Sequence, residues 1–408
     1  MVPIRYHRLI GIVVMAVCVV LGVAACSTTS PGAQAPDIQY ILVNFTDPSE
    51  AAFQEVARTI GEQKNPAVKV GVGVIVSYLS YPPEEAAARL RRYLSYAEQY
   101  DLPIIVQIDG EQWLENRPDL WNWWDPDQPG FNPENRHNVE WTSWDPADAV
   151  KIGWRDWGRQ LRVLPMPNLM SPAYREACRA EMEKLVPIVV DWYAGLPEEK
   201  RYLFVGVKVG WESSIGVNNW YYPDGNDLLD RPEKDDPKFG KTIDDLPSRG
   251  VTAMGYAAVT TLGLANGSEL TEEHLTEVVR VHLEDLSRTC AQLGVPRDHL
   301  FTHSGGWSQG ESLYTAALNE YASPGWSFYD FAGNPSLDTT AMNALAMSDA
   351  PYWGAVEWLY NGKHADDWHT AITQTLSLPA IKYLCIYNWE GIRADEQSVN
   401  AIKQFMGQ

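Results

Sequence analysis

The chain has 408 residues, including 17 Trp and 20 Tyr, and its formal net charge is -21. The length suffices for one large domain or two ordinary ones, and the ordinary apolar content excludes a largely disordered chain. Nucleic acid is a poor partner for so acidic a protein, because its surface would repel the phosphate backbone.

The first 25 residues have the pattern of an export signal. Arg5 and Arg8 precede an apolar stretch at 9–23, and small residues lead up to Cys26. The pattern resembles a bacterial lipoprotein signal, in which the cysteine is lipidated and becomes the mature N-terminus. The resemblance implies an exported protein, held by its lipid at the outer membrane or cell surface, with residues 26–37 as a flexible tether. An uncleaved anchor is the alternative and also leaves the body outside the membrane.

The first half of the body alternates strands with helices. Residues 38–45, 68–78 and 102–109 are apolar runs rich in Val and Ile, which predicts buried strands, and the stretches 48–63 and 83–100 between them have helical spacing. Strands that alternate with helices in this way predict a parallel sheet with helical crossovers.

A long irregular stretch, 110–171, interrupts this rhythm. A loop of this length in a compact domain is usually functional, and this one leaves from the carboxyl end of the third strand. We expect several of its aromatic side chains to fill a local core and one or two to face a cleft. Its tryptophans are Trp113, Trp121, Trp123, Trp124, Trp141, Trp144, Trp154 and Trp157.

The second half continues the alternation after a helix at 172–194. The apolar run from Tyr202 ends abruptly in Trp211-Glu212-Ser213-Ser214 and predicts a fourth strand, buried and parallel. Four further strands are predicted at 299–303, 326–330, 353–360 and 382–389, with helices at 251–265, 271–293 (capped by Thr271), around 371–376, and at 395–406.

Eight strands, each followed by a helix or long loop, predict an α/β fold, a (β/α)8 TIM barrel at 38–408 with a Trp-rich insertion after its third strand. Such a barrel places its chemistry at the carboxyl ends of the strands. The residues expected to face substrate there are Asp109, Glu111, Trp113, Trp211, Glu212, Asn218, His303, Trp307, Tyr329, Glu357, Trp358, Trp389 and Glu390.

Glu212 and Glu357 are the candidate catalytic pair. Each ends an apolar strand beside a tryptophan, Trp211 or Trp358. Two carboxylates suit glycoside hydrolysis, because one protonates the leaving oxygen while the other attacks or activates water. Apolar, aromatic surroundings raise the pKa of a carboxyl group, which suits the acid, and aromatic faces suit sugar rings.

This arrangement resembles the clan A retaining glycoside hydrolases, which are (β/α)8 enzymes. The resemblance implies that Glu212, after the fourth strand, is the acid/base and that Glu357, after the seventh, is the nucleophile. It also implies that Tyr329 holds the nucleophile, that Trp389 forms an aromatic floor, and that His303 lines the cleft. Trp211 departs from the pattern, because the clan commonly has Asn before the acid/base; Asn218 or Asn219 is the available substitute.

Other assignments stay open. Glu390 is an alternative partner for Glu212, and Asp109 or Glu111 is an alternative acid or sugar contact. The histidines are scattered, the first strand lacks His, and no cofactor or metal site is expected. We expect Cys178, Cys290 and Cys385 to be free thiols, because they are odd in number and far apart.

The sequence thus predicts an exported, lipid-anchored retaining glycosidase that acts on an extracellular oligo- or polysaccharide. A carbohydrate-binding protein or an inactive barrel homologue with the same anchor is the alternative, since it explains the aromatic residues and the export equally well. It does not explain two Trp-flanked glutamates at strand ends.

Overall fold

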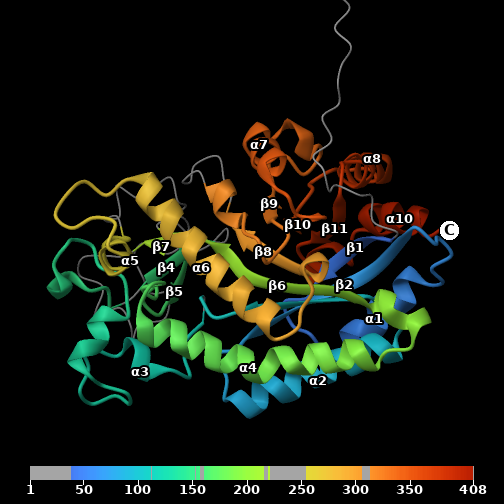
Figure 1. Ribbon diagram of the computed structural model, residues 1–408. Helices are drawn as coiled ribbons and strands as arrows, with labels where there is room; N and C mark the ends of the chain where they lie inside the picture. Colours follow the sequence, from blue (N-terminus) through green and yellow to red (C-terminus); the bar gives the residue numbers. More distant parts are fainter. Residues whose placement is uncertain are drawn as a thin grey trace, which may run out of the picture.

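The computed structural model describes residues 38–111, 113–151, 153–156, 160–215, 219–220, 254–305 and 313–407. Eight parallel strands close into a barrel, and neighbouring helices cover it (Figure 1). All eight predicted strands are confirmed to within a few residues. In barrel order they are β1 (Gln39–Asn44), β11 (Ile381–Ile386), β10 (Trp353–Trp358), β9 (Gly325–Phe328), β8 (Leu300–Ser304), β6 (Phe204–Ser213), β3 (Ile104–Asp109) and β2 (Val68–Ser77).

The predicted start of the helix at 271–293 is confirmed, and a second cap is seen at α4. Thr271 caps α6 in a reciprocal capping box with His274, and Ser171 caps α4. No helix was predicted at 339–347, where the structure has α7. The helices are α1 (Glu50–Ile60), α2 (Pro83–Gln99), α4 (Pro172–Gly195), α5 (Tyr256–Leu262), α6 (Glu272–Gln292), α7 (Thr339–Met347), α8 (Ala365–Leu376), α9 (Trp389–Ile392) and α10 (Glu396–Phe405).

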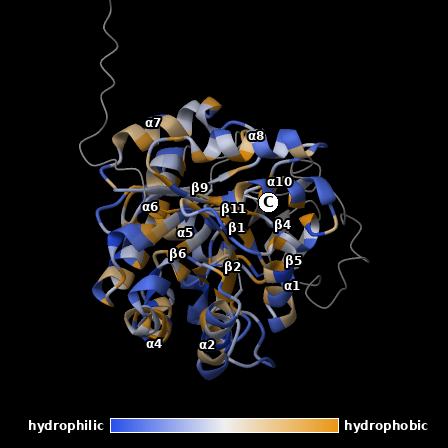
Figure 2. Ribbon diagram, turned by 90° about the vertical axis from the view of Figure 1, so that its right-hand side faces the viewer, coloured by the Kyte–Doolittle hydropathy of each residue, from blue (hydrophilic) through white to orange (hydrophobic). Residues whose placement is uncertain are grey.

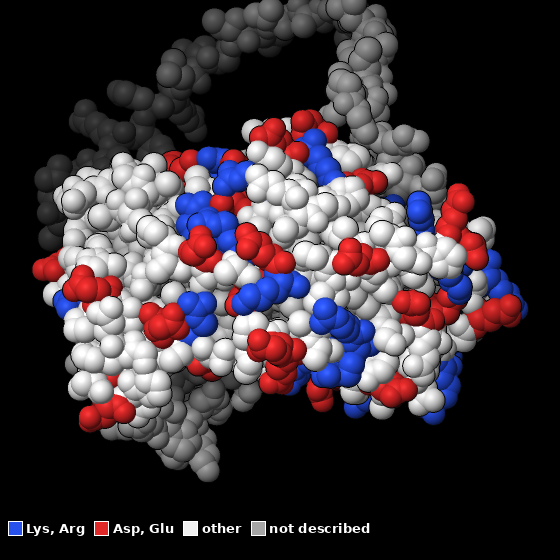
Figure 3. All heavy atoms as spheres, turned by 60° about the horizontal axis from the view of Figure 1, so that its bottom comes forward, with Lys and Arg blue, Asp and Glu red and all other residues white. Residues whose placement is uncertain are grey.

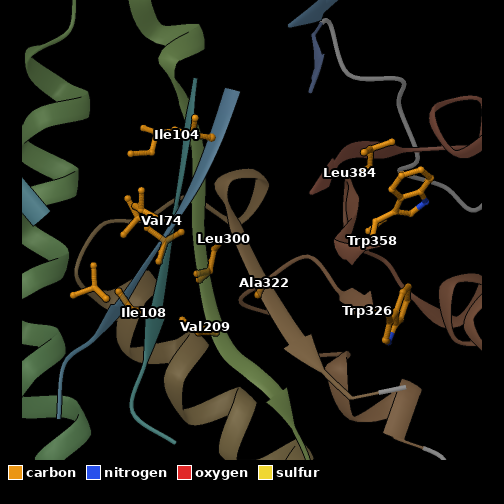
Figure 4. Close-up of a cluster of buried hydrophobic side chains, with 14 of the residues drawn as sticks. Val74, Ile104, Ile108, Val209, Leu300, Ala322, Trp326, Trp358 and Leu384 are labelled. Carbon is orange, nitrogen blue, oxygen red and sulfur yellow. The ribbon is translucent and has the colours of Figure 1, made fainter. Parts of the chain in front are cut away.

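The apolar core has two layers that the barrel wall separates. One cluster contains strand residues only, including Leu42, Ile105, Phe301 and Tyr383, and fills the inside of the barrel. A larger cluster lies between the strands and the helices (Figure 4), so the orange, apolar colour concentrates on the strands and the helix faces toward them (Figure 2). Strands buried on both faces explain the nearly continuous apolar runs of the sequence.

The insertion after β3 forms a small aromatic layer at the end of the barrel toward which β6 runs (Figure 1). It contains α3 (Pro118–Trp121), β4 (Gly153–Asp156) and β5 (Gln160–Val163), and β4 and β5 form a small antiparallel sheet with β7 (Asn219–Trp220). Several tryptophans bond within the insertion: the indole N–H groups of Trp121, Trp123 and Trp141 donate to the carbonyls of Leu114, Val150 and Arg136. These side chains fill a local core, as expected.

Charged groups of both signs mix on the face that carries α2 and α4 (Figure 3). The net acidity of the chain is therefore not concentrated on this face. Cys178, Cys290 and Cys385 are buried free thiols, as predicted. Among the described helices, none combines the length and the apolarity that crossing a membrane requires.

The insertion is attached to α5 through a buried carboxylate. Glu140 is fully buried and accepts hydrogen bonds from the backbone N–H groups of Ala257 (3.2 Å) and Ala258 (3.3 Å) in the first turn of α5. These N–H groups have no partner inside the helix, so the carboxylate satisfies donors that would otherwise be buried and unpaired.

Replacing this carboxylate should destabilise the fold. Glu140→Ala leaves the α5 donors unsatisfied, and we expect the free energy of unfolding to fall by about 1–3 kcal/mol in urea titrations. Glu134→Ala is the matched control, because Glu134 lies in the same insertion with its side chain 73% exposed. Equal stabilities for the two variants would contradict this role.

Candidate active site

Glu212 lies where β6 leaves regular strand geometry. The pairing of β6 with β8 shifts register between Val209 and Ser213, and within that bulge Gly210 (φ 78°) and Glu212 (φ 48°) both have left-handed backbone conformations. A side chain in this region costs about 1–2 kcal/mol, so the fold holds Glu212 there against a local preference. The bulge turns the carboxylate out of the strand alternation, a common device beside active sites.

Glu357 lies at a second irregularity, on β10. The register of β10 shifts between Ala355 and Glu357 against β9, and between Ala355 and Trp358 against β11. The two glutamates therefore come from strands that both bulge at their carboxyl ends. Both are buried, with 6% of Glu212 and 7% of Glu357 exposed.

The two carboxyl groups face one another inside the barrel mouth. One oxygen of each, with one ring nitrogen of His303, all lie within 4.8 Å of one another. Burial first, and then the charge of Glu212, raise the pKa of Glu357 well above its ordinary value. Two carboxylates this close do not both ionise readily, so the pair holds a proton at a pH where exposed glutamates have lost theirs.

Hydroxyl groups from β9 and the residue after it bond to Glu212. Tyr329 donates to Oε1 of Glu212 at 2.8 Å, and Ser327 donates to the same oxygen at 3.1 Å. Tyr329 also lowers the pKa of Glu357 through a hydrogen bond, an effect smaller than burial. Sequence reasoning placed Tyr329 beside the nucleophile, and the structure places it between the two carboxylates.

His303 connects this pair to a buried lysine. Its Nε2 lies 2.8 Å from Oγ of Ser327 and 3.8 Å from Oε2 of Glu357, and its Nδ1 lies 2.7 Å from Nζ of Lys208. Burial, and then the charge of Lys208, lower the pKa of His303 well below its ordinary value, so the imidazole is neutral.

Glu212, His303 and Glu357 are also the described residues whose spacing could hold a metal ion. Both ring nitrogens of His303 already lie at hydrogen-bond distance from other groups, and one of those groups is the lysine amine. A bound cation would need a free imidazole lone pair and would lie beside an ammonium group, so the local chemistry favours a hydrogen-bonded charge cluster over a metal centre.

Two other predicted carboxylates have buried partners. Asp109 accepts from the backbone N–H of Glu111 and from the hydroxyl of Ser77. Glu111 accepts from Ser213 at 2.6 Å and lies 3.1 Å from Nε2 of His282 on α6. The Glu111 carboxylate thus braces the residue after Glu212 and connects the bulge to the helix layer.

The structure pairs Glu212 with Glu357 rather than with Glu390. The Glu390 carboxylate accepts from the backbone N–H groups of Thr46 and Asp47 in the loop after β1. Trp389 is 1% exposed and donates to Glu55 on α1, and Trp358 is fully buried and donates to the carbonyl of Ala332. Trp358 and Trp389, next to Glu357 and Glu390, therefore pack in the core and do not face substrate as predicted.

A cavity of about 450 Å³ opens at the carboxyl ends of β1, β2, β6 and β11. Trp113 and Trp211, both predicted, lie in its wall, and so does Tyr387. Burial, and then the charge of Glu357, raise the pKa of Tyr387 to about 12, so this hydroxyl is neutral and lies within the electrostatic influence of Glu357. Aromatic walls with a few polar groups are typical of a small-molecule site.

Sequence reasoning missed Lys208, Ser327 and Tyr387. Lys208 carried a signal, because a lysine in the middle of an apolar strand is unusual unless it has buried partners. Ser327 and Tyr387 carried no such signal, because each is an ordinary strand or loop residue whose proximity to the glutamates depends on the closed barrel. Of the predicted residues, Asn218, Trp307 and Cys26 lie outside the described residues.

The buried pair should make stability depend on pH. Because the pKa of Glu357 is raised on folding, stability is greatest below the unfolded value of about 4.3 and falls as pH rises toward the folded value. Glu357→Gln cannot ionise, so we expect its free energy of unfolding to rise relative to that of the wild type as pH increases from 4 to 8.

Urea titrations across this range measure the effect. Glu176→Gln is the control, since the Glu176 side chain is 73% exposed on α4. Parallel pH dependences for the wild type and Glu357→Gln would contradict a shared proton at this site.

No protein-family model matches the sequence, and no curated protein does. Among solved structures, the catalytic domain of a beta-amylase from Paenibacillus polymyxa is similar, with a TM-score of 0.51 and 10% identity over 91% of this chain and 98% of that one. A family 26 endo-beta-1,4-mannanase from a Bacillus species has a TM-score of 0.44 and 11% identity over 91% and 86% of the two chains. A family 5 glycoside hydrolase from Prevotella bryantii has a TM-score of 0.41 and 10% identity over 91% and 97%.

These likenesses concern the fold. The closed parallel barrel, together with its likeness to the beta-amylase domain, confirms the predicted (β/α)8 architecture. The chain therefore shares a barrel fold with that catalytic domain.

Proposed function

We propose that this protein is a retaining glycoside hydrolase that acts on an extracellular oligo- or polysaccharide. The observation that carries the proposal is the buried pair Glu212 and Glu357, whose nearest oxygens lie within 4.8 Å at the carboxyl end of the barrel. Retaining enzymes place their carboxyl groups about 5–5.5 Å apart, whereas inverting enzymes leave about 6.5–9.5 Å for a water molecule. The close approach of the pair supports double displacement.

The contacts of the site favour Glu212 as the attacking carboxylate. Its Oε1 accepts two hydroxyl hydrogen bonds, which stabilise the ionised form. Burial and the charge of Glu212 raise the pKa of Glu357, and Lys208 and Tyr329 oppose this rise only in part. A nucleophile must be ionised and an acid must be protonated before reaction. This division is the opposite of the one that the resemblance to clan A implies.

In the first step, a carboxylate oxygen of Glu212 forms a bond to the anomeric carbon. The bond from that carbon to the leaving oxygen breaks, and this oxygen takes the proton of Glu357. In the second step, Glu357 removes a proton from water, the water oxygen attacks the anomeric carbon, and the ester bond to Glu212 breaks. Both carboxyl groups then regain their starting protonation states.

Export and lipid anchoring complete the proposal. They rest on the pattern that ends at Cys26, in a segment outside the described residues. An anchored position outside the membrane suits an enzyme that meets large glycans, because such substrates do not enter the cell intact.

Both members of the pair should be required for turnover. A panel of aryl glycosides and soluble polysaccharides identifies a substrate, and Glu212→Gln and Glu357→Gln should each lower kcat/KM by about a thousandfold or more, because each amide removes a nucleophile or an acid. Glu176→Gln, on the outer face of α4, should retain full activity.

The outcomes separate the alternatives. If Glu390→Gln loses activity while Glu357→Gln keeps it, Glu390 is the catalytic partner of Glu212 and Glu357 is not. Calorimetric binding of a glycan without any turnover would favour the carbohydrate-binding alternative. Proton NMR of the first-formed product gives the stereochemistry: retention is expected, and inversion would refute double displacement.

The cavity wall should bind sugar through Trp211. Trp211 is half-buried in the wall of this cavity, which Glu212 and Glu357 do not themselves line, and it directly precedes Glu212 in the chain. Trp211→Ala should therefore raise KM by about tenfold, which corresponds to about 1.4 kcal/mol of lost contact. Trp211→Phe keeps an aromatic face and should recover most of the affinity. An unchanged KM in the alanine variant would remove Trp211 from the substrate site.

A further inference from the structure

Lys208 is a buried cation that the proposed reaction does not itself use. It lies in β6, four residues before Glu212, and only 2% of it is exposed. Burying an ammonium group is costly unless charges and hydrogen bonds compensate. Its placement inside a strand whose other residues are apolar or Gly, apart from Glu212 and Ser213 at the end, therefore needs a reason.

The hydrogen bonds around Lys208 run in one direction. An ammonium group can only donate, so at 2.7 Å it donates to Nδ1 of His303, and the ring proton must lie on Nε2. Nε2 then donates to Oγ of Ser327 at 2.8 Å, and the Ser327 hydroxyl donates to Oε1 of Glu212 at 3.1 Å. The chain of bonds begins at a positive charge and ends at a carboxylate.

Four acidic groups face Lys208 from the surrounding strands. In order of their electrostatic effect they are Glu357 on β10, Cys385 on β11, Asp109 on β3 and Glu212 on β6, and His303 on β8 completes the ring. Burial lowers the pKa of Lys208, and the four acidic groups oppose this effect. The Cys385 thiol is neutral because burial raises its pKa, so the carboxylates supply the compensating charge.

We propose that Lys208 is the fixed counter-charge of the carboxylate pair, and that His303 and Ser327 extend its influence to Glu212 as positioning residues. The reactive state of the pair holds one proton and one negative charge, which the ammonium group balances. This inference rests on the proposed function for its role in catalysis, but the charge coupling itself can be measured without turnover.

Lys208→Met tests the counter-charge, because methionine has a similar length and no charge. Without the ammonium group each proton leaves the pair less readily, so both limbs of the pH profile of kcat/KM should move to higher pH, by about one unit or more. Lys184→Met is the control, since Lys184 lies on α4 with its side chain 49% exposed, and its profile should match the wild type. A lower but unshifted profile in Lys208→Met would mean a structural role only and would overturn the proposal.

Ser327→Ala tests the chain of hydrogen bonds from Lys208 through His303 and Ser327 to Glu212, which we call the relay. This variant also provides a test if Lys208→Met does not fold. It removes a donor to Glu212 and leaves the charge of Lys208 in place, so the acidic limb alone should move to higher pH. An unmoved acidic limb in this variant would overturn the relay.

A stability measurement separates this inference from the proposed function. The free energy of unfolding of Lys208→Met should compare best with that of the wild type at low pH, where the pair is protonated. It should fall relative to the wild type as pH rises from 4 to 8. A difference in unfolding free energy that does not change with pH would overturn the counter-charge. If the difference changes as expected but no glycoside is cleaved, the counter-charge holds and the proposed function fails.

Discussion

Two carboxylates buried in one small space cannot both be ionised at neutral pH unless a positive charge compensates them. This constraint governs the mouth of the barrel. Glu212 and Glu357 are each more than nine-tenths buried, and hydroxyl groups, an imidazole and a lysine amine surround them. The charged groups at the mouth of the barrel must therefore nearly balance one another, so that their total charge stays near zero.

Irregular strands bring the two glutamates into this shared space. β6 and β10 shift register where they present their glutamates, and Glu212 has a left-handed backbone that a non-glycine residue rarely adopts. The apolar layers inside and outside the barrel stabilise the strands on both sides of each bulge, so many ordinary packing contacts offset the local conformational cost. In a regular strand side chains alternate strictly between the two faces, so without the bulges the two glutamates would not have the orientations seen here.

The sequence predicted the barrel well because strands buried on both faces leave long apolar runs between helices, and the eight runs were visible without a repeat. It also indicated Glu212 and Glu357, since a carboxylate at the end of such a run is unusual. Its aromatic assignments were less informative. Trp358 and Trp389 stand beside glutamates in the chain but pack into the core, whereas Trp113 and Trp211 line a cavity. Trp211 and Trp358 lie at register shifts of β6 and β10, and such bulges, which change the side to which a side chain points, leave no periodic signal in the sequence.

The partners of the pair could not be read from the sequence for a similar reason. Lys208, His303 and Ser327 come from three strands, and their contacts depend on the register of a closed barrel. Glu390 was an alternative partner for Glu212, and Glu111 an alternative acid or sugar contact. In the fold Glu111 contacts Ser213 and His282, and Glu390 accepts from backbone amides after β1.

Trapping the covalent intermediate tests the central claim most directly. A 2-deoxy-2-fluoro glycoside of the identified sugar, with a good leaving group, slows the second step of double displacement more than the first. Mass spectrometry of the treated protein should show one added glycosyl group, and the peptide that carries it should contain Glu212. A label on the peptide of Glu357 would reverse the two roles and keep the pair. A label on neither, from a substrate that the protein does cleave, would contradict covalent catalysis by these carboxylates.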